Sequence, residues 1–246
     1  MKVIGGGAWA RTSVGIVVKV LTLAESRPLD PPTQGWIAIA YATTAVPGDW
    51  SLEVTAICAD LPTVDLVTDE TSSSSSELKQ LDIPCPAGTR ILGGGVQVIG
   101  PLLPIDLTIR ASVPRKVLTA TYSWFTQGRE WTPTASSWRL RGYALCADIA
   151  NPYQFIEGEA FITGRELRTS VSCPDDMIEI GYGAGVGGTN LIQRLGPGLT
   201  SSGLLMNSVL QGADFMGMSG INICIKPYLF GDGFASGDLS AWSSSQ

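Results

Sequence analysis

The amino-acid sequence repeats itself at an offset of 88 residues, and this offset constrains the fold more than any other feature. The Gly-Gly-Gly run at 5–7 recurs at 93–95, and the Cys-Ala-Asp motif that begins at Cys58 recurs at Cys146. A third copy preserves the offset at its Cys-Pro pair and then loses about ten residues. The tryptophans related by the offset are Trp36 and Trp124, and Trp50 and Trp138. We therefore expect one domain, 1–246, made of three repeats at 1–60, 85–148 and 173–226.

Each repeat contains short runs of Val, Ile, Thr and aromatic residues, separated by clusters of Gly, Pro, Ser and Asp. This pattern predicts β-strands and not helices. Three copies then predict 14–18 strands around a pseudo-threefold axis, as in a β-prism or a related closed all-β architecture. The strands expected in the first two repeats are 3–10, 15–23, 35–43, 50–59, 90–99, 105–113, 118–126 and 138–147.

Two connecting segments, 61–84 and 149–172, separate the repeats, and a tail at 227–246 follows the third. In the first connecting segment, the β-rich runs 64–68 and 78–83 flank a serine tract at 72–76. We expect each connecting segment to form a β-hairpin, with the serine tract as a mobile tip. The tail matches the first half of such a hairpin, so a closed ring would bring it beside the N-terminal strand.

The glycine runs have a structural and a functional interpretation. Glycine early in a strand permits a bulge or a close approach of two backbones, and three copies would meet near the axis. In the third repeat Gly183, Gly185 and Gly188 also match the dinucleotide fingerprint G-x-G-x-x-G. That motif requires a following helix, but Gly196-Pro197-Gly198 interrupts the chain too soon. We therefore expect a structural role and no cofactor.

Five cysteines at repeat-related positions indicate a disulfide framework with one partner absent. One pairing joins Cys58 to Cys85 and Cys146 to Cys173, and leaves Cys224 free. The alternative joins Cys85 to Cys146 and Cys173 to Cys224, and leaves Cys58 free. We favour the first, because hairpin pairing would bring Cys58 close to Cys85. The missing sixth cysteine would stand four residues before Met1, so the sequence starts inside a repeat.

The second repeat opens with Cys-Pro-Ala-Gly at 85–88, continues through the glycine run and closes with Leu145-Cys146-Ala147. In these motifs it resembles a loose group of secreted actinobacterial β-repeat proteins of mostly unknown function. The resemblance implies export and a β-repeat fold. It extends over the first repeat from Lys2, whereas the third repeat has Asp175 and Asp176 in place of Ala-Gly. The threefold plan is also similar to that of β-prism lectins and the vitelline membrane outer layer protein.

Composition excludes several function classes. The chain has no histidine, which excludes Ser-His-Asp and Cys-His catalysis and any histidine-containing metal site. Its net charge is −6 and its basic residues are scattered, so we expect no nucleic-acid partner. No apolar stretch is long enough to span a bilayer, and no secretory signal is evident. Few charges and many Ser, Thr and Gly still favour an extracellular or particle-associated protein.

Residues that do not repeat are the better candidates for ligand contacts, because repeated aromatic residues are expected to pack in the core. Acidic residues without counterparts are considered in the same way, but no pair is shown to converge as a hydrolase requires. Asp232 and Asp238 supply too few ligands for Ca²⁺, so we expect no metal. The candidate ligand-binding residues are Trp9, Tyr41, Trp131, Tyr153, Asp175, Asp176, Tyr182 and Trp242.

We therefore favour a non-enzymatic binding or surface protein that recognises a carbohydrate or another cell-surface ligand, with oligomerisation left open. One alternative is a histidine-free enzyme, for instance a cyclase or isomerase, with carboxylates or tyrosines in an apolar pocket. Another is a structural subunit of an extracellular particle, which a mean hydropathy of +0.20 and an unpaired cysteine would suit.

Overall fold

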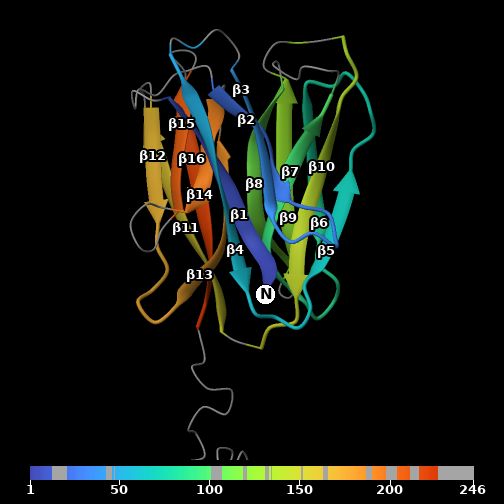
Figure 1. The fold of residues 1–246 in the computed structure, drawn as a ribbon, viewed down its shortest axis with the longest axis vertical. Coiled ribbons are helices and arrows are strands. Elements are labelled where there is room, and N and C mark those ends of the chain that lie inside the picture. The colour runs from blue at the N-terminus through green and yellow to red at the C-terminus, as the bar shows by residue number, and fades with distance from the viewer. Residues whose placement is uncertain are drawn as a thin grey trace, which may run out of the picture.

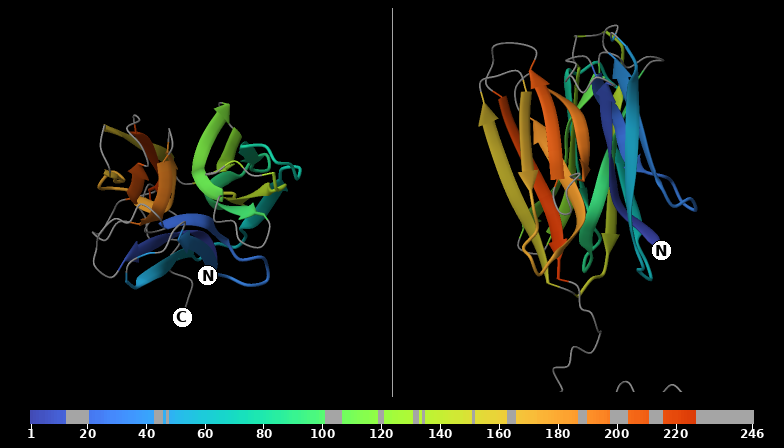
Figure 2. Two further views of the ribbon diagram at one scale, coloured as in Figure 1. Left: turned by 90° about the horizontal axis from the view of Figure 1, so that it is seen from above. Right: turned by 60° about the vertical axis from the view of Figure 1, so that its left-hand side comes forward.

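The computed structural model describes residues 1–12, 21–42, 46, 48–100, 107–118, 121–130, 133, 135–150, 152–162, 166–186, 190–197, 204–210 and 216–226. Sixteen strands and no helix lie within these ranges, which confirms the all-β class (Figure 1). The strands form three antiparallel sheets that do not join into one barrel. Seen from above, three groups of strands surround a common centre (Figure 2).

The sheets are named I, II and III, and their strands are given in spatial order. Sheet I contains β12 (Glu166–Val171), β15 (Leu204–Leu210), β14 (Asn190–Pro197), β1 (Lys2–Thr12) and β4 (Trp50–Ala59). Sheet II contains β3 (Trp36–Ala42), β2 (Leu21–Pro28), β7 (Arg90–Ile99), β10 (Arg139–Ala147) and β5 (Asp65–Glu70). Sheet III contains β11 (Tyr153–Ile162), β16 (Met216–Ile225), β13 (Ile178–Val186), β8 (Leu107–Leu118), β9 (Thr121–Glu130) and β6 (Leu78–Pro84).

Strands from different parts of the chain take corresponding places in the three sheets. The inner strands β1, β7 and β13 pair on one side with β4, β10 and β16, respectively. On the other side they pair with β14, β2 and β8. Every sheet therefore combines strands that are remote in sequence, and β1 joins the beginning of the chain to its last third.

The inner strands approach one another at glycine, as the sequence predicts. A Cβ atom on Gly93 would lie 2.3 Å from the carbonyl oxygen of Ile4, and one on Gly181 would lie 2.0 Å from that of Leu92. On Gly5 it would lie 3.1 Å from the carbonyl oxygen of Ile180. The register of each inner strand shifts at the residue just before this glycine. A side chain has no room at Gly93 and Gly181 and little room at Gly5, so glycine is required at these contacts, and a bulge residue precedes each one.

The second glycine of the first two runs faces a tryptophan. Trp36 packs against Gly6, and Trp124 packs against Gly94, with ring atoms 2.4 Å from where a Cβ would stand. Their indole nitrogens donate hydrogen bonds to Ser26 and Ser112, at 3.0 and 2.9 Å, so the buried polar edge is satisfied. Both tryptophans therefore belong to the core.

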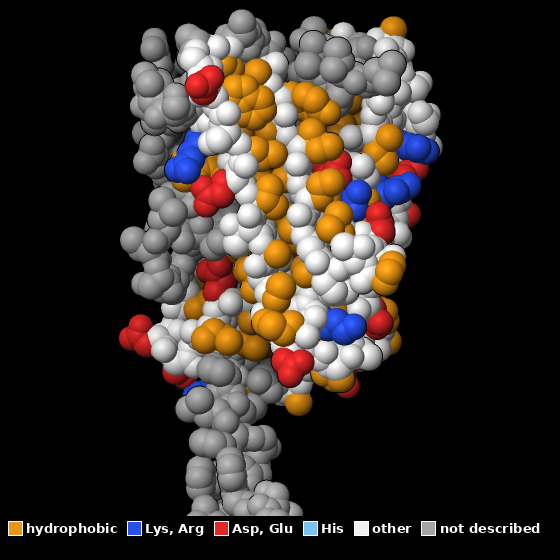
Figure 3. Space-filling view, in the orientation of Figure 1, with side chains coloured by type: hydrophobic (Ala, Val, Ile, Leu, Met, Phe, Trp, Pro, Cys, Tyr) orange, Lys and Arg blue, Asp and Glu red, His pale blue; other side chains and the backbone are white. Residues whose placement is uncertain are grey.

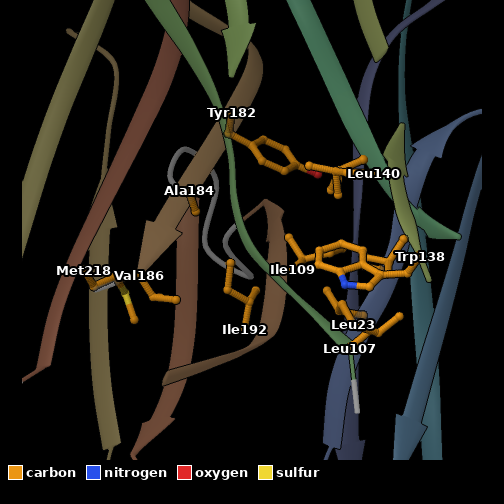
Figure 4. Packing of buried hydrophobic residues seen from close by; sticks show 13 residues of the cluster. Leu23, Leu107, Ile109, Trp138, Leu140, Tyr182, Ala184, Val186, Ile192 and Met218 are labelled. Atoms are coloured by element: carbon orange, nitrogen blue, oxygen red, sulfur yellow. The ribbon is translucent and has the colours of Figure 1, made fainter. Parts of the chain in front are cut away.

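The largest apolar side chains gather between the sheets. Leu23 of β2, Ile109 of β8, Leu140 of β10 and Tyr182 of β13 pack in one cluster, together with Trp138 (Figure 4). Trp138 is 1% exposed, which confirms its predicted core position. Trp50, one repeat earlier, is 39% exposed, so the same prediction is wrong there.

The favoured disulfide pairing is wrong. Cys85 is bonded to Cys146 and Cys173 to Cys224, whereas Cys58 is free and exposed. The Cys58–Cys85 and Cys146–Cys173 bonds, with Cys224 free, were expected from hairpins in the connecting segments. Those hairpins do not form.

The two strands of each connecting segment instead pair with strands of the next repeat. In the first segment β5 pairs with β10 and β6 pairs with β9. In the second, β11 pairs with β16 and β12 with β15. In the second and third repeats, the cysteine near the end of the last strand therefore lies beside the cysteine that precedes the first strand.

Candidate ligand-binding surface

The predicted site residues do not come together. Trp9 is half-buried on β1 in sheet I, where the guanidinium of Arg11 lies 4.7 Å from the ring centroid. Tyr41 is half-buried on β3 in sheet II. Burial, together with the negative charge of Glu25, raises the pKa of the Tyr41 hydroxyl. Trp131 and Trp242 lie outside the described residues.

Tyr153 belongs to a packed aromatic cluster. Its ring centroid lies 5.3 Å from those of both Tyr122 and Phe155, in edge-to-face geometry. Its hydroxyl donates a hydrogen bond to the carbonyl oxygen of Ile91, and burial raises its pKa well above the ordinary value. These contacts make Tyr153 part of the structure rather than an open platform for a ligand.

Tyr182 is 3% exposed and also belongs to the core. It stands on β13 where β1 and β7 have Gly6 and Gly94. Its ring therefore occupies the side of the strand on which those glycines face a tryptophan. A non-repeating aromatic residue can thus mark a change in core packing, which the sequence argument did not consider.

Asp175 and Asp176 lie in the turn before β13 and are exposed. Asp176 forms an ion pair with Lys226, with 2.9 Å between the carboxylate oxygen and the amine nitrogen. The hydrogen bond and charge of Lys226 lower the pKa of Asp176. Within the described part of the chain, no three Cys, Asp or Glu side chains cluster as a metal site requires.

A hollow of about 470 Å³ opens at the surface near β10, and we call it the serine hollow. It is broad and open rather than enclosed. Its lining residues are Ser73, Ile99, Gly100, Ser136, Ser137 and Arg139.

Ser73 of the serine tract reaches this hollow because the tract continues the pairing of β5 along β10. Thr71 donates its backbone N–H to the carbonyl oxygen of Leu140 at 2.9 Å. Further on, Ser74 and Trp138 exchange two backbone hydrogen bonds, at 3.1 and 2.9 Å. The tract is therefore not the tip of a hairpin. It crosses from sheet II to sheet III over Trp138, whose indole nitrogen donates to the carbonyl oxygen of Ser76 at 3.0 Å.

Charges are organised around the hollow. Glu70 accepts from Arg139 at 2.9 Å and from Arg141 at 2.6 Å, so one carboxylate holds two guanidinium groups. Lys79, which is buried beneath the tract, donates to the carbonyl oxygen of Ser72 and to the hydroxyl of Ser74. Burial lowers the pKa of Lys79, against the opposing charge of Glu130. The surroundings of the hollow combine cations with hydroxyl donors and acceptors, a set that suits polyhydroxyl or acidic ligands.

These residues are not among those predicted from the sequence. The serine tract was expected to be the tip of a connecting hairpin, and Arg139 and Arg141 belong to the basic residues that are scattered along the chain. The available signal was the coincidence of a serine run at 72–76 with a second serine pair, Ser136-Ser137. No local pattern shows that these two segments meet, because they come together only when β5 pairs with β10.

A half-buried acid, Glu179 of β13, lies elsewhere. Burial raises the pKa of Glu179 to about 7, although a hydrogen bond from Asn222 opposes the shift. The Asn222 amide nitrogen lies 2.7 Å from the Glu179 carboxylate and 2.8 Å from the carbonyl oxygen of Val171. These contacts give Glu179 a structural partner, and neither of them brings it a nucleophile.

Comparison with known proteins gives no family assignment, since neither a protein-family model nor a curated protein matches this sequence. In the described residues no helix has the length and apolar character needed to cross a membrane.

Proposed function

We propose that this protein is a binding module that recognises glycans at the serine hollow. The observation that carries the proposal is the hollow itself, which is lined by Ser73, Ser136 and Ser137 together with Arg139. Sugar hydroxyls both donate and accept hydrogen bonds, and serine hydroxyls do the same. The guanidinium adds a charge-assisted donor, so a sugar that carries a carboxylate or sulfate would bind more tightly than a neutral one.

We also propose that the three sheets form a pseudo-threefold β-prism of three repeats. The corresponding places of β1, β7 and β13 in their sheets support this arrangement. The contacts at Gly5, Gly93 and Gly181 also support it, because at these glycines β1 contacts β13, β7 contacts β1 and β13 contacts β7. In such a prism the outer surfaces and connecting segments carry the ligand sites, because the interior is filled by side chains.

Export to an oxidising compartment fits the two disulfides. We further propose that the chain is similar to the secreted Cys-Pro-Ala-Gly repeat proteins, in which case the Cys85–Cys146 bond would join the cysteine that opens the motif to the one that closes it. A cell-surface or extracellular glycan is the ligand class that such a location would offer.

The test uses the full-length protein on an array of neutral and acidic glycans, followed by calorimetry with the best ligand. We expect Arg139→Ala to weaken binding at least tenfold, and Ser137→Tyr to abolish it by filling the hollow. Arg115→Ala is the matched control, because Arg115 forms a comparable exposed ion pair with Asp82 on sheet III. Absence of any glycan binding contradicts the proposal, as does binding that all three variants retain.

A further inference from the structure

The outer edge of β4 lacks a partner among the described residues. β4 is the last strand of sheet I and pairs only with β1. Its side chains are unusually open for a strand of this composition, with Trp50 39% and Val54 41% exposed and the Cys58 thiol at the surface. Hydrophobic side chains gather on the face of the molecule where β1 and β4 lie (Figure 3).

The same strand is covered in the next repeat. On β10 and just before it, Trp138, Ala144 and Cys146 are at most 1% exposed. They stand 88 residues after Trp50, Ala56 and Cys58, which are all exposed. The difference therefore lies in what covers the strand and not in its own residues.

β10 is covered by the segment that follows the preceding repeat. β5 begins seven residues after Cys58 and runs antiparallel to β10, with Asp65 opposite Cys146. The serine tract then continues to Trp138, which pairs with Ser74, sixteen residues after Cys58.

β16 is covered in the same way. β11 begins seven residues after Cys146 and runs antiparallel to β16, with Gln154 opposite Cys224. Each last strand is thus paired with the segment that follows the repeat before it. If the three repeats form a ring, the third repeat precedes the first. The segment that follows the third repeat is then the expected partner of β4.

We propose that the segment after β16 pairs antiparallel with the outer edge of β4 in the same chain. The spacing from the preceding cysteine is seven residues in sheet II and eight in sheet III. It therefore places Gly231 or Asp232 opposite Cys58. At the other end, the spacing of sixteen residues places Ser240 opposite Trp50. Sheet I would then have six strands, as sheet III has.

The composition of the segment fits this role. It has apolar side chains at Phe234, Leu239 and Trp242, which can pack against the exposed positions of β4. The end of β16 lies at the same end of the molecule as the Cys58 end of β4 (Figure 1). The twenty residues of 227–246 would extend roughly 65 Å, whereas the ten residues of β4 need about 33 Å. This inference is independent of the proposed glycan site.

The free thiol of Cys58 provides the test. Gly231→Cys and Asp232→Cys are made separately in the full-length protein and oxidised mildly with copper phenanthroline. We expect at least one of them to form a disulfide with Cys58 in most molecules, at the mass of one chain. Ser240→Cys is the control, and it should not react with Cys58 because it lies at the far end of β4.

Cross-linking by neither variant overturns the proposal, as does equal cross-linking by all three. Cross-linking that yields only dimers overturns it in favour of strand exchange with a second copy. Peptide mapping of Cys85–Cys146 and Cys173–Cys224 checks that each variant retains the native fold.

A second measurement requires no new disulfide. We expect amide hydrogen exchange in β4 to be at least tenfold faster in the double variant Phe234→Pro/Ala235→Pro, because proline cannot donate to the ladder. Exchange in β10 should not change. Ser244→Pro/Ser245→Pro is the control, since both residues lie beyond the proposed strand. Unchanged exchange in β4 contradicts the pairing.

Discussion

In the core of this protein, two glycines pack directly against tryptophan rings. A Cβ atom on Gly94 would lie 2.4 Å from the Trp124 ring and 2.4 Å from the carbonyl oxygen of Tyr143. Neither neighbour can move cheaply, because one is a buried ring and the other is backbone in the sheet. Both residues are repeated at the 88-residue offset, so their importance is visible in the sequence, whereas their contact is not.

Gly94→Ala should therefore destabilise the protein by about 3 kcal/mol, at the upper end of the range for overpacking a core. Urea denaturation followed by circular dichroism would measure the change. Gly185→Ala is the control, because its Cβ would meet no atom closer than 3.4 Å. We expect that variant to lose less than about 1 kcal/mol. Equal losses in the two variants would show that close packing at Gly94 is not the cause.

Glu179 makes stability depend on pH. Its pKa is raised from 4.5 to about 7, so the folded state holds the proton more tightly than the unfolded state. The stabilising contribution of the protonated acid is complete below pH 4.5 and is lost as the pH rises through about 7. The chain has no histidine, so no other side chain with an ordinary pKa titrates in the middle of this range.

We expect Glu179→Gln to remove this dependence while its amide oxygen still accepts the hydrogen bond from Asn222. The melting temperature of the unchanged protein should fall between pH 4.5 and 7.5, and that of the variant should stay nearly constant and be higher above pH 7. Differential scanning calorimetry across this range would measure both. Parallel curves would mean that Glu179 is not the group that titrates.

At the scale of the strands, the pairing of strands determines which cysteines are bonded to each other. Cys85 precedes β7 and Cys146 lies near the end of β10, and these two strands are antiparallel neighbours. Cys58 lies on β4 opposite Val3, and no second thiol is nearby in the described residues. The same register that joins one pair of cysteines therefore leaves Cys58 free.

Removing the Cys85–Cys146 bond by changing both residues to Ala should cost about 4 kcal/mol, because the bond spans 61 residues. Cys58→Ser should cost less than about 1 kcal/mol, because it breaks no disulfide. Chemical denaturation gives both values. Thiol labelling of the unfolded but unreduced protein, with peptide mapping, should find one labelled cysteine, Cys58, and labelling at Cys224 instead would contradict this pairing.

Most of the strands could be predicted from local sequence, because alternating β-rich runs and turn residues act over a few positions. The expected 50–59 and 90–99 match β4 and β7 closely. Hairpins in 61–84 and 149–172 were wrong for a physical reason. Each strand has two edges at which a partner can pair. The strand that is next in the chain competes for these edges with remote strands, and the remote strands are preferred where they bury more apolar surface. The serine hollow depends on the same remote pairing, so it could not be predicted.

At the scale of the whole molecule, every sheet pairs strands that come from different repeats. β1 pairs with β14, β2 pairs with β7, and β8 pairs with β13. No repeat contains all the partners of its own strands. The stability of each part should therefore depend on the presence of the others.

We expect full-length protein to unfold in one cooperative transition, with coincident changes in circular dichroism and tryptophan fluorescence. A fragment of residues 85–148 should remain unfolded, because its strands would form two isolated antiparallel pairs with exposed apolar faces. The same two measurements on the fragment would check this. A folded fragment would show that the repeats are independent domains.

The sequence by itself determined the period of 88 residues, the all-β class, and the places where glycine must admit a close backbone contact. These follow from local spacing and side-chain size, which any folded arrangement of the chain has to satisfy. Only the tertiary structure decided which cysteines are joined, which tryptophans are covered and where hydroxyl groups gather. These depend on which strands become neighbours, and strand pairing is chosen by the burial of surfaces contributed from distant parts of the chain.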